Sequence, residues 1–580
     1  IVHRSEHPEF DIAQVKPTLH IPLWMVWACA LGFVLPALGS YGILNNNEGL
    51  YAEIPREMLA SHDWRHWVIP HLNGLPYMEK PPLLYWLTAL SFSLFGISEW
   101  SARLAPVLSS LACVGMLVHF GQAIGRVQAG RLAALMFVSG VGVTVMSRTL
   151  MFDMLLTACL TAALMCAYRY SAGGGEGGKG LLRYAYAWLA LAVMAKGIVA
   201  IILFGAVVAL MLLPAVLLPG GFMRVCRDWF EPGAILFFLA IAAPWHIAAS
   251  LVEPIFPWFY FINEHVLRFL GRREPHDYYA GAWWYYLPRM ALYLFPWSFL
   301  LPCLLTPRLA PEGAQSAGRS DDARNCRRFL LLAWLAPLVF FSVSSAKANY
   351  YLVVVMPFAA FHLALALEDR GFLRAPLRLA PGLLIALPVA VCAAFAMRAG
   401  YIAAAPLTFI ASLTPTQFMS AALAGLAGLA LLCGIIAWRW ASVGILAYLA
   451  LPAWCAAALV VTVNAVEPLV STRPLAQFLQ TGLTGKSVYL YRNFEELSSL
   501  PFYLQQPVGV IDSRSNDLYW GNKLQANDLL ITGDQFEKIL SSRQVAVVVP
   551  ERQIKDFRAS RFFMRIKGER HIGAATVFFN

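Results

Sequence analysis

The stretch NNEGLYAEIPREML (residues 46–59), continued by YMEKPPL (residues 77–83), forms a polar loop between long apolar segments of the chain. It brings carboxylates, a lysine, an arginine and tyrosines together within a short length of sequence. Such a density of polar groups beside a bilayer is costly unless the groups bind or transform a ligand. The stretch therefore predicts one wall of a catalytic site at a membrane surface.

The composition of the whole chain is that of a membrane protein. Of its 580 residues, 59% are hydrophobic and only 13% are charged, whereas soluble proteins average about 25% charged residues. Apolar runs recur between residues 21 and 463, and each is long enough to cross a hydrocarbon core of about 30 Å. We attribute the net charge of +11 to cytoplasmic loops and to an anionic lipid substrate. No basic stretch carries a nucleic-acid-binding motif.

The segment 81–96 decides the number of membrane crossings. Its sixteen residues are marginal for a full span. If it is a juxtamembrane helix that does not cross, the chain has about thirteen spans, and the loop arginines fall inside as the positive-inside rule requires. Such arginines include Arg126, Arg131, Arg224, Arg227 and Arg439. The loops 42–100 and 252–287 then lie outside. The predicted spans are 21–41, 101–121, 127–147, 153–171, 184–196, 198–218, 232–251, 288–306, 329–345, 351–368, 380–398, 418–437 and 441–463.

The chain divides into a transmembrane domain, residues 1–463, and an outer domain, residues 464–580. The second part contains short β-branched runs separated by helical or turn-forming stretches, which predicts a small α/β domain. We find no catalytic motif in it, and its role as a lid or as a docking site for the acceptor is a hypothesis. The predicted strands are 487–491, 508–511, 529–531, 545–549 and 576–579.

For several residues of the outer loops, the sequence is consistent with a catalytic or binding role and also with a purely structural role. Glu48 lies where the first span ends, and a carboxylate there suits the removal of a proton from an acceptor group. Asn47 also fits a helix N-terminus, where carboxylates are favoured by the helix dipole. Lys80 is either an ordinary lysine reaching to the interface or the cation that neutralises a lipid-linked phosphate. Glu79 and His265 are candidate ligands of a divalent metal.

Other polar residues fall on the same side of the membrane. Arg268 follows His265 in an outer loop, and guanidinium groups bind phosphate through two hydrogen bonds. Five more polar residues lie at the outer ends of predicted spans. Each of them alone is typical of a membrane interface, but their position on the same side of the membrane favours a shared site. They are Arg148, Asp153, Lys196, Lys347 and Tyr350. The chain contains no P-loop or DxD motif, and its Gly-rich run 173–180 (GGGEGGKG) is typical of a flexible connection, so we expect no nucleotide cofactor.

The sequence resembles the GT-C glycosyltransferases related to protein O-mannosyltransferases, and among them the bacterial lipid A 4-amino-4-deoxy-L-arabinose transferases. The resemblance covers most of the first 370 residues. It implies thirteen spans, juxtamembrane helices in the first outer loop and a periplasmic C-terminal domain. The stretches that carry it are residues 46–64, 69–96, 148–157 (RTLMFDMLLT), 194–199 (MAKGIV), 261–271 (FINEHVLRFLG) and 344–358 (SSAKANYYLVVVMPF).

The resemblance also implies roles for individual residues. Lys80 and Arg268 would hold the carrier phosphate, and Glu79 with His265 would lie at a possible zinc or magnesium position. The remaining candidates would line the substrate cavity: Asn47, Tyr51, Arg56, Tyr77, Asp153, Lys196, Lys347 and Tyr350. Family members commonly have Asp-Glu where this chain has Asn47-Glu48. Either Glu48 takes the role of the catalytic carboxylate, or the acceptor needs no strong base.

The function predicted from these features is sugar transfer from a polyprenyl (undecaprenyl) phosphate carrier to an envelope acceptor such as lipid A. The transferred sugar would be 4-amino-4-deoxy-L-arabinose or a different sugar. The enzyme would be a monomer in the bacterial inner membrane, with its active site facing the periplasm and in contact with membrane lipids. One alternative is a protein or polysaccharide acceptor. Another is a lipid-linked sugar flippase, although transporters usually place polar groups near the bilayer midplane.

Overall fold

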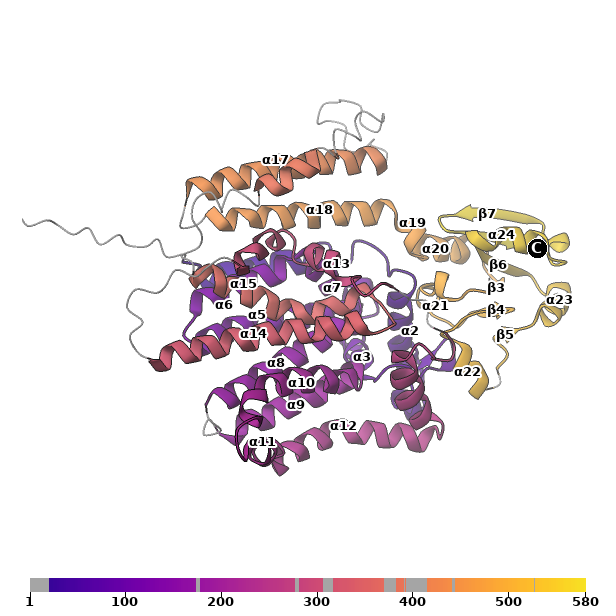
Figure 1. Ribbon diagram of the computed structural model, residues 1–580. Helices are drawn as coiled ribbons and strands as arrows, with labels where there is room; N and C mark the ends of the chain where they lie inside the picture. The colour runs from indigo at the N-terminus through magenta and orange to yellow at the C-terminus, as the bar shows by residue number, and fades with distance from the viewer. Residues whose placement is uncertain are drawn as a thin grey trace, which may run out of the picture.

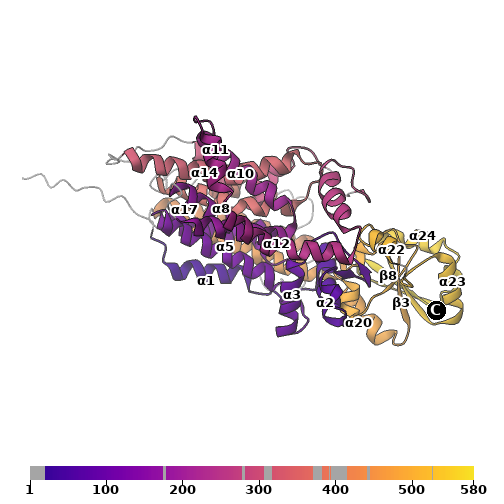
Figure 2. The ribbon, with the colours of Figure 1, turned by 90° about the horizontal axis from the view of Figure 1, so that it is seen from below.

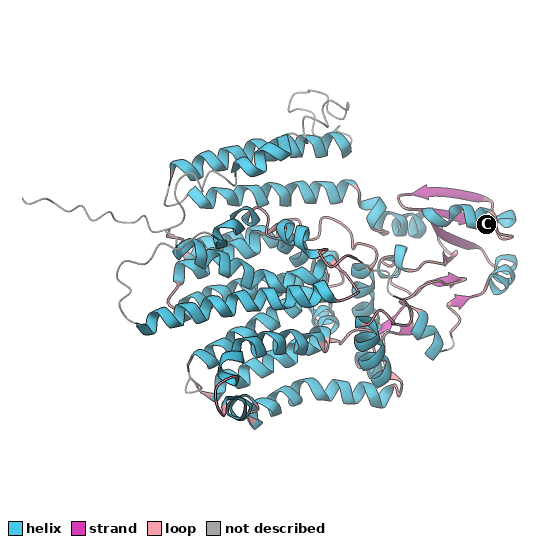
Figure 3. Cartoon of the chain, viewed as in Figure 1, coloured by secondary structure: helices cyan, strands magenta, loops and turns pink. Residues whose placement is uncertain are grey.

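A bundle of long helices and a C-terminal α/β domain make up the molecule (Figure 1). The computed structural model describes residues 20–173, 178–276, 281–305, 317–369, 382–390, 392, 415–440, 444–525 and 527–580. In these parts of the chain, strands occur only in the C-terminal domain and in the short hairpin of β1 (His71–Leu72) and β2 (Leu75–Pro76) (Figure 3).

Eight helical segments in the described residues are long and apolar enough to cross a membrane. A ninth span results if α6 (Val127–Ser139) and α7 (Val141–Ser147), which meet at 68°, count as one. The eight segments are α5 (Leu104–Ala123), α8 (Phe152–Ala172), α10 (Val199–Val216), α12 (Pro232–Val252), 322–343 of α14 (Ala317–Val343), 349–369 formed by η4 (Asn349–Val355) and α15 (Met356–Asp369), 421–439 of α17 (Pro415–Arg439), and 444–465 formed by η6 (Gly444–Leu449) and α18 (Ala450–Ala465).

Helices that are shorter or less apolar than these eight lie at other predicted spans. The first predicted span contains α1 (Leu23–Val34), and the span 184–196 lies within α9 (Lys179–Lys196). The span 288–306 is divided between α13 (Tyr286–Tyr293) and η3 (Trp297–Leu305). In the predicted span 380–398, residues 382–390 are helical, and the other positions except residue 392 lie outside the described residues. By length and composition, the described chain therefore contains eight or nine of the thirteen predicted crossings.

The first outer loop contains two helices that lie outside this set. α2 (Asn47–Ala60) lies between the ends of the bundle helices and the C-terminal domain (Figures 1 and 2). α3 (Leu83–Phe95) has 13 residues, which at 1.5 Å per residue span about 20 Å, too little for a hydrocarbon core of about 30 Å. It follows Pro81 and Pro82 and ends at Gly96, whose φ of 80° is readily adopted only by glycine. The helix within the segment 81–96 is thus shorter than a full crossing requires.

The remaining helices of the membrane part are short connections. They are η1 (Trp64–Trp67), α4 (Glu99–Ala102), α11 (Gly221–Trp229) and the π-helix η2 (Trp258–Leu267). Of these, η2 belongs to the second long outer loop and carries residues of the candidate site.

The C-terminal domain is a six-stranded mixed sheet with the order β5-β4-β3-β6-β8-β7. Four strands are parallel, namely β3 (Ser487–Tyr491), β4 (Gly509–Ile511), β5 (Leu530–Ile531) and β6 (Val545–Pro550). An antiparallel hairpin of β7 (Gly568–Ile572) and β8 (Ala575–Phe579) completes it. β7 was not predicted, because its sequence GERHI is polar. The helices of the domain are α19 (Glu467–Val470), α20 (Arg473–Gly482), η7 (Glu495–Leu497), α21 (Leu500–Leu504), α22 (Tyr519–Leu524), α23 (Gly533–Ser542), η8 (Glu551–Gln553), α24 (Ile554–Arg558) and η9 (Phe563–Arg565).

Hydrogen bonds to backbone carbonyls fix this domain to the outer loops. The amide of Asn46 donates to the carbonyl of Glu495 at 3.1 Å, and the Ser498 hydroxyl donates to the carbonyl of Asn46 at 2.8 Å. On the second outer loop, the indole of Trp520 donates to the carbonyl of Glu274 at 2.8 Å. The C-terminal domain is therefore bonded to both loops that carry the predicted site residues.

Candidate functional site

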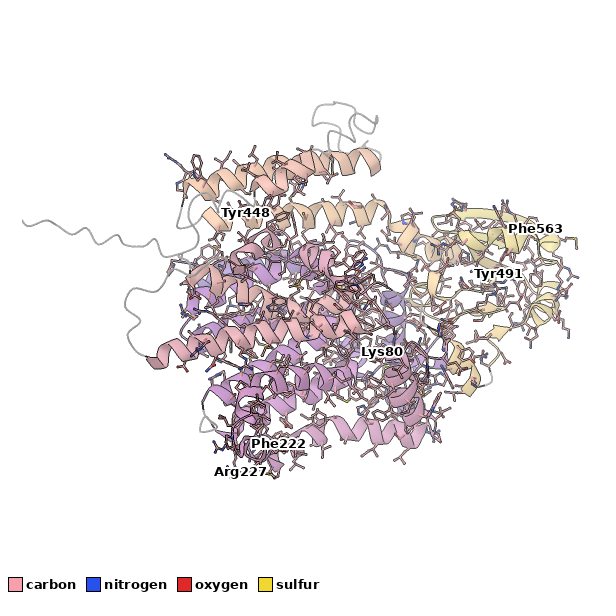
Figure 4. The ribbon with its side chains drawn as sticks, viewed as in Figure 1. Lys80, Phe222, Arg227, Tyr448, Tyr491 and Phe563 are labelled. Atoms are coloured by element: carbon pink, nitrogen blue, oxygen red, sulfur yellow. The ribbon has the colours of Figure 1, made fainter. Side chains whose placement is uncertain are left out.

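A cavity of about 320 Å³ lies where the helical bundle meets the C-terminal domain. Figure 4 shows Lys80, one of its lining residues, at this junction. The lining residues come from the first outer loop, the N-terminal end of α8, the C-terminal end of α9, η2, the C-terminal end of α14, η4 and the C-terminal domain. Segments far apart in the sequence thus share one cavity at one end of the bundle.

One wall of the cavity carries a network of three cations and two carboxylates. Arg268 Nη1 lies 3.0 Å from Glu264 Oε2, and Arg273 Nη2 lies 2.5 Å from Glu79 Oε1. Arg273 Nε also pairs with Glu264. Lys80 Nζ is held more loosely, 3.7 Å from Glu79 Oε2 and 3.8 Å from Glu264 Oε2. The network has one net positive charge, and Lys80 is well placed to exchange its distant partners for an anionic ligand.

The protonation of this wall follows from burial and from its charges. Burial and the neighbouring Arg268 lower the pKa of Lys80, while Glu79 and Glu264 oppose this shift. Burial alone would raise the pKa of Glu264, but Arg273, Arg268 and Lys80 outweigh it and lower the pKa. A phosphate placed beside Lys80 would favour its charged form, because an opposite charge nearby stabilises an ammonium group.

Asp153, Lys196 and Tyr350 also line the cavity, as predicted. Asp153 lies in the first turn of α8 and forms an ion pair with Lys196 at the end of α9. The Lys196 ammonium lies 5.1 Å from the ring centroid of Tyr350 and 4.6 Å from that of Tyr351, within the range of cation–π attraction. The pair thus ties two membrane helices together at the cavity.

Apolar side chains form another part of the lining. They belong to α8, α10, α14 and the end of η2, and they are Leu156, Val199, Ile202, Phe269, Phe340 and Phe341. Ile202 and Phe269 are also exposed on the surface of the bundle. A ligand with a charged head and a hydrocarbon tail would meet both kinds of surface.

Asn47, Tyr51 and Tyr77 line the cavity, whereas Glu48 does not. Glu48 is 2% exposed, and its oxygens lie 2.9 Å and 3.0 Å from Arg103 Nε and Nη2. They also accept hydrogen bonds from the amides of Leu44 and Leu150. The structure therefore does not support the predicted role of Glu48 as the acceptor's base, since four donors already occupy its carboxylate.

Two other predicted cavity residues have structural contacts instead. Arg56 is paired with Glu53 and donates to the carbonyl of Gln505 in the C-terminal domain at 3.1 Å. Lys347 is buried and donates to the carbonyls of Phe341, Ser342 and Ser344 at the end of α14. Neither side chain lines the cavity. Sequence position alone did not reveal that backbone carbonyls satisfy Lys347.

Arg148 likewise lies within the fold, where it donates to the carbonyls of Phe33 and Pro36 at 3.2 and 2.5 Å. It is buried and does not line the cavity. Its position at the end of a span thus reflects the packing of α7 against the C-terminal end of α1.

Glu79 and His265, the predicted metal ligands, both line the cavity, and other protein groups engage most of their donor atoms. His265 Nδ1 lies 2.6 Å from the Tyr260 carbonyl, and Nε2 lies 3.3 Å from the amide of Ile198. Both ring nitrogens are thus engaged when Nδ1 carries the proton. Burial lowers the pKa of His265 and so favours the neutral form. Glu79 is paired with Arg273. Within the described ranges, no group of three His, Cys, Asp or Glu residues is arranged to hold a metal.

Four further charged residues line the cavity and were not predicted as site residues, namely Glu264, Arg273, Glu495 and Asp517. Glu264 and Arg273 are close to Arg268 in sequence, but their ion pairs were not predicted. Glu495 follows β3 and Asp517 follows β4, both on the carboxyl side of parallel strands. Ligands of open α/β sheets commonly bind at the carboxyl ends of the strands. That rule, applied to the predicted strands 487–491 and 508–511, could have identified this part of the cavity.

Comparisons with known proteins connect this architecture to a fold. The family described as dolichyl-phosphate-mannose-protein mannosyltransferase matches residues 79–247. The crystal structure of ArnT from Cupriavidus metallidurans bound to undecaprenyl phosphate superimposes with a TM-score of 0.77. At 22% identity, this match covers 96% of this chain and 97% of ArnT. This chain has the ArnT fold. The fold is of the GT-C type that the sequence resemblance predicted.

Curated relatives extend the likeness to sequences. The undecaprenyl phosphate-alpha-4-amino-4-deoxy-L-arabinose arabinosyl transferase 1 of Sodalis glossinidius is 33% identical over 328 residues, 55% of this chain and 54% of that relative. The corresponding transferase of Aeromonas hydrophila is 32% identical over 338 residues, 57% of each chain. The chain thus spans just over half the length of the curated relatives it matches. The superposition on ArnT covers 96% of this chain, so the shared fold includes the C-terminal domain.

Proposed function

We propose that this chain is a membrane glycosyltransferase that moves a sugar from a polyprenyl phosphate carrier to an envelope acceptor. The observation that carries the proposal is that Lys80 and Arg268 lie at one cavity beside an apolar wall. The names of the relatives describe an undecaprenyl phosphate-linked 4-amino-4-deoxy-L-arabinose. We therefore take that compound as the donor and lipid A as the acceptor to test first.

The charges of the cavity suit the departure of a phosphate. As the bond between the sugar and the carrier breaks, negative charge grows on the phosphate oxygen, and fixed cations stabilise that charge in the transition state. Lys80 and Arg268 supply the cations, while Glu264 and Glu79 hold Arg268 and Arg273 in place. The prenyl chain packs against the apolar wall, where each buried CH₂ contributes about 0.8 kcal/mol.

The membrane arrangement belongs to the same proposal. We place the cavity on the periplasmic face of the bacterial inner membrane, with thirteen crossings and a monomeric enzyme. The positions of loop arginines such as Arg126 and Arg227 in the sequence support this orientation, because cytoplasmic loops carry an excess of Lys and Arg. Cysteine labelling of the outer loops from each side of sealed vesicles tests it.

The deciding experiment measures transfer by the purified protein in proteoliposomes. Undecaprenyl phosphate-4-amino-4-deoxy-L-arabinose and lipid A are supplied, and the modified lipid A is detected by mass spectrometry. We expect the wild type to form product and Lys80→Met and Arg268→Gln to lose at least about 100-fold in rate, in line with the loss of one charge-stabilising group. Arg272→Gln is the matched control, since Arg272 is exposed, close to Arg268 and outside the cavity lining.

Other results would change the conclusion. Full activity in both Lys80→Met and Arg268→Gln would remove the basis of the proposal. Product on a protein or polysaccharide in place of lipid A would keep the enzyme class and correct the acceptor. Movement of the donor across the bilayer with no covalent product would identify a transporter.

A further inference from the structure

The cavity contains five carboxylates, which differ in how firmly other groups engage them. They are Glu79, Asp153, Glu264, Glu495 and Asp517. A carboxylate accepts a proton most readily when neither a cation nor a hydrogen-bond donor engages it, because both favour its charged form. Comparing the contacts of the five therefore identifies which of them is available.

Three of the five are held in ion pairs. Glu79 is bound by Arg273 at 2.5 Å and receives a weaker hydrogen bond from Tyr77 at 3.4 Å. Asp153 pairs with Lys196, and Glu264 pairs with both Arg268 and Arg273. Taking up a proton at any of these carboxylates would weaken an ion pair with a buried cation, which is energetically costly.

Glu495 supports the segment that carries Asp517. Its Oε1 accepts a hydrogen bond from the Ser515 hydroxyl at 2.6 Å and another from the amide of Asp517 at 3.1 Å. The Asn516 side chain donates to the carbonyl of His276 at 3.1 Å, and the amide of Leu518 donates to Ser515 at 3.1 Å. These bonds hold the backbone at Asp517 while leaving its carboxyl group unused.

The Asp517 carboxyl group has neither a hydrogen bond nor an ion pair with any residue that the structure describes. It faces the cavity together with the amides of Asn47 and Asn46, which do not act as bases. Burial, Glu79 and Glu495 raise its pKa well above the ordinary value, while Arg273 and Lys80 oppose the shift. A raised pKa brings a carboxyl group closer to the operating pH, where a general base is most effective.

We propose that Asp517 of the C-terminal domain is the proton-accepting residue of the transferase. The acceptor oxygen forms the new bond to the anomeric carbon of the sugar, and its proton passes to the Asp517 carboxylate. The bond between that carbon and the carrier's phosphate oxygen breaks, and its electron pair stays on the polyprenyl phosphate. Asp517 then releases the proton to water. This inference rests on the proposed function, and it makes the C-terminal domain part of the active site.

The test compares Asp517→Asn with the wild type in the transfer assay. We expect the rate to fall by about 100-fold or more, the usual contribution of a general base. Binding of undecaprenyl phosphate should stay within twofold, because Lys80 and Arg268 hold the phosphate. The wild-type rate should increase with pH as the carboxyl group ionises, and this dependence should be absent in the variant. Asp528→Asn, in an exposed position of the same domain, is the control and should retain the wild-type rate.

The outcomes separate this inference from the proposed function. If the wild type transfers sugar and Asp517→Asn does so at the same rate with the same pH dependence, Asp517 is not the proton acceptor, and the transferase proposal stands. If the wild type forms no product, both fall together. Should Asp517→Asn not fold, Asp517→Ser replaces it, and undecaprenyl phosphate binding verifies its fold. If neither folds, the wild-type profile decides, since a rate that does not increase with pH contradicts a carboxylate base.

Discussion

Arg103 donates to both carboxylate oxygens of Glu48, at 2.9 and 3.0 Å, in a pair that is almost completely buried. The same guanidinium donates to the carbonyls of Leu38, Tyr41 and Gly42. The pair therefore connects the beginning of α2 to the segment that follows α1. It sets the position of Asn47 and Tyr51 at the cavity without contacting the ligand space.

The first prediction is that Glu48→Gln loses activity through loss of stability. Removing one partner of a buried ion pair leaves the other charge uncompensated and costs about 3–5 kcal/mol. We expect Glu48→Gln and Arg103→Gln each to lower the thermal unfolding midpoint, and the double variant to lose less than the sum of the two. A Glu48→Gln protein with the wild-type midpoint and no turnover would instead restore Glu48 as a catalytic residue.

The second prediction concerns Lys347. Its ammonium group donates to the Ser342 carbonyl at 2.7 Å and to the Phe341 carbonyl at 2.9 Å, and hydrogen bonds of charged groups contribute about 1.5–3 kcal/mol each. Lys347→Met should therefore lower the free energy of unfolding in mixed micelles by about 2–3 kcal/mol. The KM for the donor should not change, because the side chain lies outside the cavity. An increased KM at unchanged stability would show that Lys347 binds substrate.

Glu48 and Lys347, compared with Lys80 and Arg268, show how much of the site could be predicted from the sequence. Lys80 and Arg268 were found because a cation in an outer loop next to a span end is unusual. Lys347 shared that feature, and Glu48 is a carboxylate at a similar position, but their partners, the end of α14 and Arg103, became clear only from the fold. Asp517 lies more than 400 positions after Lys80, and only the packing of the C-terminal domain on both outer loops brings the two to one cavity.

The fold followed from the sequence to a similar extent. Apolar runs and loop arginines predicted the bundle and the juxtamembrane helix at residues 83–95. The parallel strands of the C-terminal domain were found from β-branched runs. The polar strand β7 and the bend of 68° between α6 and α7 had no such pattern, because they depend on contacts with neighbouring elements.

The third prediction tests the contact between α2 and the C-terminal domain. A Cβ atom at Gly49 would lie 2.6 Å from the backbone nitrogen of Ser499, closer than packed atoms approach each other. Gly49→Val should therefore displace the domain and reduce transfer by at least about 10-fold, since small misplacements of catalytic groups are costly. Gly32→Ala is the control, because nothing lies within 4 Å of its added Cβ. Wild-type transfer by Gly49→Val would show that the domain need not dock at α2.

The fourth prediction is that metal removal does not stop transfer. Both ring nitrogens of His265 are engaged, and Oε1 of Glu79 is paired with Arg273. Only Oε2 of Glu79, which accepts a weak hydrogen bond from Tyr77 at 3.4 Å, remains for a metal. Protein treated with a chelator and transferred to metal-free buffer should keep its rate within twofold, and added Zn²⁺ or Mg²⁺ should not increase it. A rate that falls on chelation and returns with one metal would establish a metal requirement.

The fifth prediction follows from the raised pKa of Asp517. A carboxyl group with a higher pKa in the folded state contributes its full stability below the unfolded pKa of about 3.9. That contribution is lost as the pH rises through the folded-state pKa. Asp517→Asn keeps a neutral side chain throughout and avoids this loss. The variant should therefore unfold at a higher temperature than the wild type at pH 8, and the difference should shrink as the pH is lowered toward 4. A variant that is less stable at pH 8 would show that the ionised carboxylate has a partner in the fold.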